Sequence, residues 1–493
     1  MPAYYLEAYV VVLGLVLLMA EAFGPSSRKS YLGAFAVLGL IGALFMLGFA
    51  EAPSADNREM QRFYEFDAHA KFYKGFALVC ALFVTILAVD FRRILSDFTE
   101  DPGSEDGTGE YYCLPLFACA GMMWMASAVD LVSLFVALEL VTITFYVLVA
   151  YMRRNVGSLE AGVKYLILGA LSTGFLVYGI AWIYGTTGTT NLAEIAQVLE
   201  ANDGLATTPL FFGLALIILA LAFKVGAVPM QIWIPDVYQG APTPTTAFLS
   251  IGSKAAGFAV LIRTLEPFLE APVTAKQTTV VLFILSALTI LAGNLAAIAQ
   301  SNFKRLLGYS SIAHAGFILL AVTAWTQGSD TTQSSKEVVG FYLTTYLIMT
   351  LGVFFVLSAI RKATGSEEIS AFEGLGRRNP FLALCTAILV SALAGLPLTA
   401  GFLGKFLVFQ TAIGHPDPEL QKLLWGAIGV GFIGVAAGFY YYLKVIRSMY
   451  WVAPQDEHPL RLSAASGLLI PVFALATIIL GIYPQPILWL VGS

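Results

Sequence analysis

The feature that most limits how this chain can fold is a long series of apolar runs, each about as long as a bilayer is thick. A transmembrane helix needs about 20 mainly apolar residues, and the sequence contains fourteen such runs. Their approximate bounds are 3–23, 31–50, 71–91, 111–129, 131–152, 160–185, 208–230, 241–268, 277–299, 303–325, 337–361, 380–411, 421–451 and 464–491. The runs lack the alternation of apolar and polar residues that marks a membrane β-barrel. We therefore predict an all-α polytopic membrane protein with about 14 transmembrane helices.

Composition excludes most other classes of protein. Apolar residues make up 58% of the 493 residues and charged residues 12%, whereas soluble domains carry about 25% charged residues. A formal net charge of −5 leaves no basic surface for a nucleic acid. The longest polar stretches are too short to bury a core of their own; they are 51–70, 92–110, 186–207 and 362–379. Any activity is therefore expected within the bilayer.

No pattern in the sequence is typical of a metal or cofactor site. The cysteines form no Cys-x-x-Cys pair, whereas an iron–sulfur cluster normally needs four clustered thiolates; they are Cys80, Cys113, Cys119 and Cys385. Gly429, Gly431 and Gly434 match the spacing of a dinucleotide-binding loop. They lie inside an apolar run, however, where small residues serve helix packing. We expect no cofactor and no metal in this chain.

Basic residues predict the orientation of the chain, because cytoplasmic loops are enriched in Lys and Arg. With the N-terminus outside, fourteen basic residues fall in inside loops and seven in outside loops or edges. We therefore predict that both termini lie on the non-cytoplasmic side. The first apolar run has no basic region ahead of it, so we expect no cleaved signal peptide.

Two of the runs contain a proline that should break a helix. Pro229 lies in the seventh run and Pro397 in the twelfth. Each proline removes a helical hydrogen bond and clashes with the carbonyl four residues earlier, on Val225 and Leu393 respectively. A freed carbonyl in the bilayer must face protein or water.

The two breaks are five runs apart, which indicates an internal repeat. Runs 4–8 and 9–13 would form two five-helix units, the second inverted relative to the first because five is odd. Inverted repeats with broken helices are typical of transporters, although prolines alone also kink membrane helices. We predict an N-terminal three-helix segment, a first repeat, a second inverted repeat and a C-terminal helix, at residues 1–110, 111–268, 269–451 and 452–493.

Three ionisable residues lie well inside apolar runs, where a charge costs about 2.5–3.5 kcal/mol on insertion scales. Glu139 lies in the middle of its run, Lys224 lies five residues before Pro229, and Lys254 lies in the eighth run beside Ser250 and Ser253. A structural salt bridge is the alternative for Glu139. For the two lysines the alternative is a side chain that extends to the membrane surface.

Three further candidates have stronger structural alternatives. Lys405 follows the second break by eight residues and could also extend to the surface. Lys164 lies four residues after Glu160 on the same helical face, so the two could form an interfacial ion pair. His314 lies in an apolar run and could be a hydrogen-bonded packing residue.

Taken together, these residues indicate a proton relay along the membrane. Four lysines cannot all stay charged in a poorly solvated interior, because desolvation and mutual repulsion both disfavour the charged form. Some should therefore be neutral or switch between states. A lysine that switches carries a proton on a flexible stem, and water near the helix breaks can complete the path.

Several segments are similar to one known family. Residues Phe223–Phe258, FKVGAVPMQIWIPDVYQGAPTPTTAFLSIGSKAAGF, closely resemble subunit N of bacterial NADH–quinone oxidoreductase, the proton-translocating respiratory complex I. The segments that begin at Asp130, Asn302 and Leu393 resemble the same family. The resemblance covers roughly residues 111–451. The related subunits M and L and the Mrp-type antiporters usually carry histidine-containing sequence where this chain has PDVYQGAPT.

The resemblance implies a role for each candidate residue. Glu139 would pair with Lys224 on the broken helix 7, and Lys254 would be the central lysine of helix 8. Lys164 would be an additional lysine of helix 6. His314 would lie on the connecting path in helix 10, and Lys405 would lead to the exit side in helix 12.

The resemblance also implies a function and partners. The chain would be a proton-translocating membrane subunit of a bacterial inner-membrane complex that oxidises NADH and reduces quinone. It would bind neighbouring membrane subunits and lipid, while FMN and iron–sulfur clusters would belong to other subunits and quinone would bind elsewhere. The alternatives are an Mrp-type cation/proton antiporter subunit, which needs no redox partner, and a membrane scaffold without transport.

Overall fold

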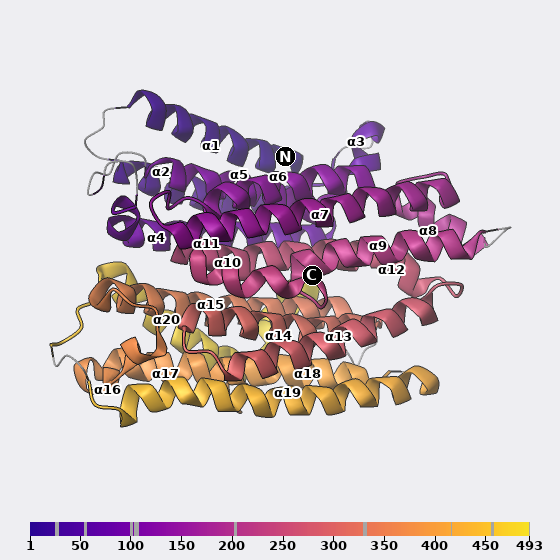
Figure 1. Cartoon of the computed structure of the whole chain (residues 1–493). Coiled ribbons are helices and arrows are strands. Elements are labelled where there is room, and N and C mark those ends of the chain that lie inside the picture. The colour runs from indigo at the N-terminus through magenta and orange to yellow at the C-terminus, as the bar shows by residue number, and fades with distance from the viewer. Residues whose placement is uncertain are drawn as a thin grey trace. The chain divides into compact units, whose positions relative to one another are not determined.

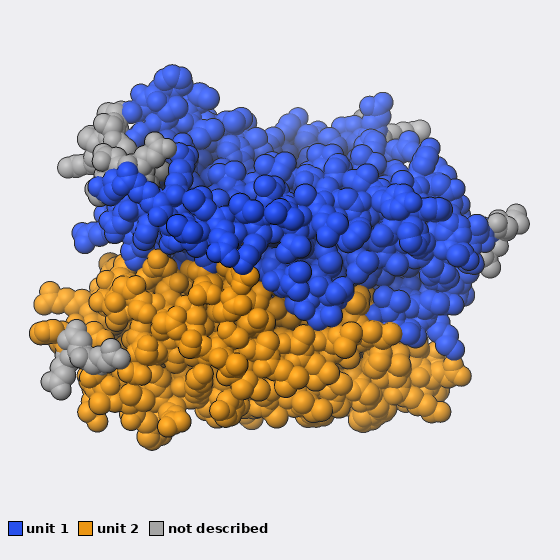
Figure 2. Space-filling view, viewed as in Figure 1, with its two compact units in different colours: residues 1–233, 240–281 blue, residues 234–239, 282–493 orange. Residues whose placement is uncertain are grey.

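The computed structural model describes residues 1–24, 29–53, 57–98, 102, 108–201, 205–328, 333–415, 417–454 and 458–492. Helix accounts for 82% of the structure, and these ranges contain no β-strand, only isolated β-bridges. The predicted all-α class is confirmed. The chain packs as two compact units, coloured separately in Figure 2. Unit 1 is Met1–Trp233 with Gly240–Val281, and unit 2 is Ile234–Gln239 with Leu282–Ser493.

Unit 1 is a bundle of long helices (Figure 1). Within it α4, α5 and α12 pack on one another, α1 packs on α5, α2 packs on α4, and α7 packs along α9. The helices are α1 (Tyr4–Phe23), α2 (Ser30–Leu47), α3 (Arg58–Phe63), α4 (Ala68–Ser96), α5 (Glu110–Ser127), α6 (Leu131–Val149), α7 (Val156–Thr187), α8 (Leu192–Ala201), α9 (Thr207–Val225), η1 (Met230–Trp233), α11 (Thr243–Phe248), η2 (Leu249–Ser253) and α12 (Lys254–Glu270).

Unit 2 is built around α15, which packs against α14, α17, α18 and α20. The short helix α10 (Ile234–Gly240) contributes its first six residues to this unit, and α13 (Ala275–Ile298) begins in unit 1 and continues in unit 2. The remaining helices are α14 (Phe303–Thr323), α15 (Ser335–Thr364), η3 (Ile369–Phe372), α16 (Leu375–Arg378), α17 (Pro380–Ala394), α18 (Ala400–Ile413), α19 (Pro418–Trp451), α20 (Ala464–Ile482) and α21 (Gln485–Gly492).

Eleven of the described helices are long and apolar enough to cross a membrane. The other three expected spans also fall on helices. One is the shorter apolar helix Tyr31–Leu47, one is α5, and one is divided between Pro380–Ala394 and Ala400–Ile413. The chain is therefore a multi-span membrane protein, and the count of fourteen stays a prediction.

Polar residues between the apolar runs set where several helices begin. Asp130, the lone charged residue between two runs, accepts a hydrogen bond from the backbone of Val132 at 2.8 Å and starts α6. Asn155 starts α7 and Asn302 starts α14 in the same way. These side chains satisfy backbone N–H groups that the first helical turn leaves without partners. They keep adjacent spans separate where the loop is very short.

Both predicted helix breaks are present. Helix α9 ends at Val225 and is followed by Gly226 in the left-handed conformation, with φ of 81°. Helix α17 ends at Ala394 and is followed by Gly395, with φ of 95°. Only glycine adopts this conformation without a steric cost. In each case the proline lies two or three residues beyond the glycine, so glycine ends the helix before the proline prevents its continuation.

Candidate functional site

The first group of candidate residues lies in unit 1, at the end of α9. Lys224 is the penultimate residue of that helix, and it is 6% exposed. Its Nζ donates a hydrogen bond to Thr142 Oγ1 on α6, and Thr142 in turn donates to the Leu138 carbonyl at 2.6 Å. The amine also lies 5.6 Å from the centre of the Phe223 ring. A buried ammonium group is thus held by a neutral hydroxyl beside a helix break.

Glu139 lies on α6, one helical turn before Thr142, and is half-buried. Its carboxylate accepts a hydrogen bond from Thr173 Oγ1 on α7 at 2.7 Å. Glu139 is close enough to Lys224 for electrostatic attraction, but the two do not form a direct ion pair within the described residues. Each is bonded to a threonine hydroxyl instead, so the pairing implied by the resemblance stays a prediction.

Lys254 is the first residue of α12 and is 2% exposed. The π-helical turn η2 directly precedes it. Single π-helical turns inside α-helices are rare and occur often at functional sites. The most apolar eighteen-residue window of Thr243–Glu270 is completely buried. Lys254 therefore lies in the interior of unit 1, as its place in the eighth run predicts.

Lys164 differs from the other candidates. Its Nζ lies 2.6 Å from Glu160 Oε1, one helical turn away, and its side chain is 42% exposed on the protein. This is the ion pair that the spacing of Glu160 and Lys164 offered as the alternative interpretation. The structure does not bring Lys164 into the buried group with Lys224.

The second group lies in unit 2. His314 on α14 is 3% exposed, and its Nδ1 lies 2.7 Å from Tyr342 Oη. Lys405 on α18 is 6% exposed and donates to the carbonyls of Leu393 and Ala394 at 3.1 and 2.8 Å. Leu393 is the carbonyl that Pro397 should free, and Lys405 satisfies it. Because the Lys405 amine lies 5.4 Å from the Phe317 ring, one turn beyond His314 on α14, the two candidates share a neighbourhood.

Hydroxyl groups around His314 were not predicted from the sequence. Ser310 and Ser311 lie one turn before His314 and are buried. Ser310 is hydrogen-bonded to Tyr442 Oη, and Ser311 Oγ lies 3.1 Å from Tyr238 Oη. The serine pair, at helical spacing from a histidine in an apolar run, was the available signal. Hydroxyls and imidazoles both donate and accept hydrogen bonds.

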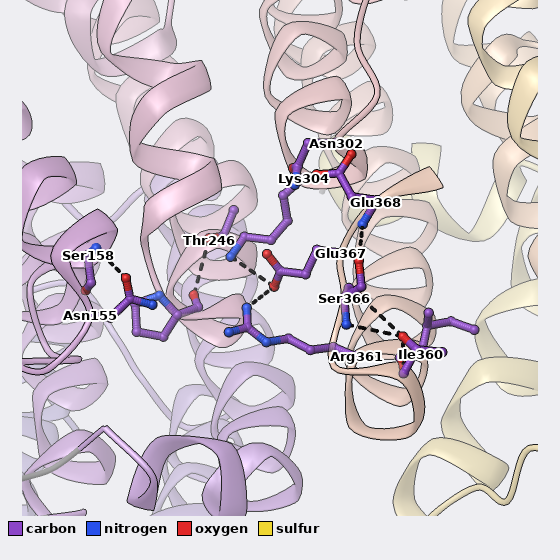
Figure 3. Close-up of polar contacts among 12 residues, drawn as sticks. Asn155, Ser158, Thr246, Asn302, Lys304, Ile360, Arg361, Ser366, Glu367 and Glu368 are labelled. Atoms are coloured by element: carbon purple, nitrogen blue, oxygen red, sulfur yellow. Dashed lines mark hydrogen bonds and ion pairs between the residues drawn. The ribbon is translucent and has the colours of Figure 1, made fainter. Parts of the chain in front are cut away.

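Figure 3 shows a second cluster in unit 2 that the sequence did not reveal. Lys304 lies at the edge of the apolar run 303–325, yet its side chain is 0% exposed and its Nζ lies 3.2 Å from Glu367 Oε1. Arg361 forms a second ion pair with the same carboxylate. Burial disfavours the Glu367 anion, but the charges of Lys304 and Arg361 outweigh it and lower the pKa of Glu367 below its usual value.

The PDVYQG segment has a structural anchor in the same unit. Arg305 Nη1 donates to Asp236 Oδ1 at 2.5 Å and to Gln239 Oε1 at 3.1 Å. Asp236 belongs to α10, which follows the first break. The segment that supports the resemblance most strongly is thus held by charge at the start of α14.

The described residues include no group of three or more His, Cys, Asp or Glu able to hold a metal ion. All four cysteines are buried and free. The side chains that the site offers are amines, a carboxylate, an imidazole and hydroxyls. Such groups can hold and transfer protons.

Comparison with known proteins finds a family model and relatives that match this sequence. A family model described as NADH:quinone oxidoreductase/Mrp antiporter, TM, matches residues 128–418. The NADH-quinone oxidoreductase subunit N of Trichlorobacter lovleyi is 38% identical over 486 residues, covering 98% of this chain and 94% of that protein.

Two solved structures are also similar to this chain. A chain of respiratory complex I from Thermus thermophilus with bound aureothin has a TM-score of 0.77 at 30% identity, covering 98% of both chains. A chain of the Mrp complex from Dietzia sp. DQ12-45-1b has a TM-score of 0.79 at 20% identity, covering 99% of this chain and 96% of that one. The second likeness is one of fold alone.

Proposed function

The chain belongs to the NADH:quinone oxidoreductase/Mrp antiporter family of transmembrane subunits, and on this premise we propose that it transfers protons across a membrane as subunit N of an NADH–quinone oxidoreductase. In this role it oxidises nothing itself. Neighbouring subunits hold FMN, the iron–sulfur clusters and the quinone site. This chain converts a conformational or electrostatic signal from quinone reduction into proton movement.

The observation that most supports the proposal is the position of Lys224. Its buried amine ends a broken helix, is bonded to a neutral hydroxyl and is attracted by the Glu139 carboxylate. A buried ammonium is costly unless it is compensated. A change in the charge or position of Glu139 therefore changes how readily Lys224 releases its proton. Lys254, in the interior of the same unit, is the proposed next carrier.

In unit 2 the proposed carriers are His314 and Lys405. Tyr342 holds the histidine ring by one nitrogen, and the tautomer then decides whether the other nitrogen accepts or donates. Lys405 lies at the second break, where its amine already contacts two carbonyl oxygens. For Lys164 we propose only an accessory role at the helix surface, since its amine is exposed and paired with Glu160.

We further propose the finer topology. Fourteen spans include two inverted five-helix repeats at 111–268 and 269–451, an N-terminal segment at 1–110 and a C-terminal segment at 452–493 that contains α20 and α21. The similar breaks after α9 and α17, each ending on a left-handed glycine, support the repeat. We propose a bacterial inner membrane with both termini on the non-cytoplasmic side.

The direct experiment replaces Glu139 or Lys224 in the assembled complex. Lys224→Ala and Glu139→Gln are expected to lower the number of protons pumped per NADH, since each removes a proton donor or acceptor whose loss slows a transfer step by about 10²–10⁴. Proton uptake is measured in closed vesicles with NADH oxidation recorded in parallel. Normal pumping in both variants, with the subunit present at normal level, refutes the assignment.

A matched control uses a lysine that the structure sets apart. Lys164→Ala should leave assembly intact and reduce pumping less than Lys224→Ala. The Mrp-type alternative predicts ion exchange without NADH and no co-purifying flavin. A pure scaffold predicts that changes at Lys224 alter assembly alone.

A further inference from the structure

A second buried ion pair lies in the N-terminal helices of unit 1, away from Lys224. Lys74 Nζ on α4 is bonded to Glu7 Oε1 on α1, and the two side chains are 0% and 5% exposed. The residues are 67 positions apart, so no local pattern reveals the pair. The proposed proton relay uses neither residue.

Tyr64 closes this pair into a triad. Its hydroxyl donates to Glu7 Oε1 at 3.1 Å and accepts from Lys74 Nζ at 2.9 Å. The third lysine hydrogen bond goes to the Met123 carbonyl on α5 at 3.1 Å. Lys74 thus already contacts two neutral acceptors besides the carboxylate. These can hold the ammonium group if Glu7 becomes neutral.

Tyr64 also lines a cavity of about 630 Å³ in unit 1. A water molecule occupies about 30 Å³ in the liquid, so the cavity has room for on the order of twenty waters. Its lining includes three carboxylates, on Glu65, Glu266 and Glu270, and the guanidinium of Arg263. The cavity therefore carries several charged groups on a partly apolar wall, and Tyr64 lies between it and the buried pair.

Charged and titratable groups face Lys74 from each element packed around it. Besides Glu7 and Tyr64 these are Cys119 on α5, Asp67 at the start of α4 and Arg263 on α12. Arg263 is itself bonded to Glu65 at 3.3 Å and to Asp67 at 2.7 Å. Its charge is thus largely balanced at the cavity wall. Of these groups, only Tyr64 both contacts the pair, through its hydroxyl, and lines the cavity.

We propose that the Lys74–Glu7 pair is a second proton-exchange site, loaded from water in this cavity through the Tyr64 hydroxyl. On loading, Tyr64 gives its proton to the Glu7 carboxylate and takes one from a hydronium ion that enters the cavity from solvent and is left as water, so one proton is gained and Tyr64 is regenerated. Lys74 stays an ammonium group, loses its bond to the Glu7 carboxylate and keeps its bonds to Tyr64 and the Met123 carbonyl. Unloading reverses these steps, and no electron is transferred.

The test needs no NADH, so its failure is distinct from failure of the proposed function. The purified, assembled complex is taken through a rapid fall in pH, from about 9 to about 5, and followed by infrared difference spectroscopy of carboxyl groups. The expected result is a protonated-carboxyl band that is absent in Glu7→Gln. Identical spectra for the native protein and Glu7→Gln overturn the proposal.

The route is tested by removing one hydroxyl. Tyr64→Phe should slow the rise of the Glu7 band by about a hundredfold. Tyr73→Phe is the matched control, because Tyr73 precedes Lys74 on α4 and its buried hydroxyl has no hydrogen-bond partner within the described residues. An unchanged rate in Tyr64→Phe, or equal slowing in both variants, overturns the tyrosine route.

A purely structural role for the pair makes a different prediction. Replacing a buried ion pair by apolar residues of similar volume is often neutral for stability. If the pair serves only packing, the double variant Glu7→Leu with Lys74→Met should pump protons as the native complex does. The proposal instead predicts loss of the Glu7 band and fewer protons per NADH. If the double variant fails to assemble, the two tyrosine variants still decide the outcome.

Discussion

The break after α9 and the break after α17 both begin with a left-handed glycine, yet they position their lysines differently. In unit 1, Lys224 precedes the break and its amine is bonded across to Thr142 on α6. The buried Phe223 carbonyl at the same helix end accepts a hydrogen bond from the Trp233 indole at 3.2 Å. The lysine therefore takes no part in closing the helix end.

In unit 2 the lysine follows the break and closes the helix end itself. Lys405 donates to the last two carbonyls of α17, on Leu393 and Ala394. A cation at a helix C-terminus is favourable because it satisfies carbonyls and opposes the helix dipole. The comparison teaches that a lysine beside a helix break can cap the helix end itself, or leave capping to a neutral side chain and bond to another helix.

The largest expected difference between the two breaks is in how much their lysines contribute to the free energy of unfolding. Lys405→Ala removes a charged donor from two buried carbonyls and should lower the free energy of unfolding by about 1.5–3 kcal/mol. Lys224→Met breaks one bond to a hydroxyl and fills similar space, so it should cost much less. The thermal unfolding midpoints of the two purified variant complexes provide the measurement. Equal midpoints would show that Lys405 does not cap α17.

Low pH should destabilise the segment of chain that leads into the second helix break. Residues 366–378 lead into α17, and Glu367 anchors them to Lys304 and Arg361. Because the folded-state pKa of Glu367 is below its ordinary value of 4.5, its contribution to stability is present above about pH 4.5 and is lost as pH falls through the lower folded-state value. The loss is about 1.4 kcal/mol per pH unit within that window.

Hydrogen exchange measured at a series of pH values would check this prediction. Protection at the start of α17 should fall in acid before protection in α9 does. Glu367→Gln should show the reduced protection already at neutral pH. A simultaneous loss in both helices would contradict a specific role for the anchor.

The sequence predicted where the helices break, but not which distant side chains contact each other near the breaks. The reason is physical. Pro229 and Pro397 act on their own helices, so spacing alone located both breaks, and the freed Leu393 carbonyl followed from covalent geometry. Apolar length predicted the helices in the same way. Lys304 meets Glu367 63 positions away, and nothing local distinguishes it from a loop lysine.

For Lys164 the sequence predicted the local contact but not the exposure of the side chain. Four-residue spacing correctly indicated a possible contact with Glu160, since that contact is local. Which face of α7 is covered depends on packing against other helices, and no residue of α7 itself encodes it. The same limit applies to Glu139, whose actual hydrogen-bond donor, Thr173, lies on another helix.

A smaller effect is expected from the indole that closes the first break. Trp233→Phe keeps the ring contacts with Tyr165 and Phe223, whose centres lie 4.8 and 5.2 Å away, but removes the N–H bonded to the Phe223 carbonyl. One neutral hydrogen bond contributes about 1 kcal/mol. The thermal midpoint should fall less than in Lys405→Ala, while pumping by the assembled complex persists. A drop as large as that of Lys405→Ala would mean that the two caps are equivalent in strength.

The smallest effect should come from the ion pair that fixes α10 after the first break. Arg305 and Asp236 are 30% and 33% exposed, and partly exposed pairs contribute about 0.2–1 kcal/mol. Arg305→Ala should therefore barely change the thermal midpoint, yet raise hydrogen exchange in residues 234–240, because Asp236 and Gln239 both lose their bond to Arg305. Arg305→Lys keeps the charge but not the guanidinium, whose Nη1 is bonded to both Asp236 and Gln239, so its exchange rate should lie between those of the native protein and Arg305→Ala. If exchange in that segment stays at the native rate in Arg305→Ala, then α10 is held by packing alone, and charge stabilises only the second break.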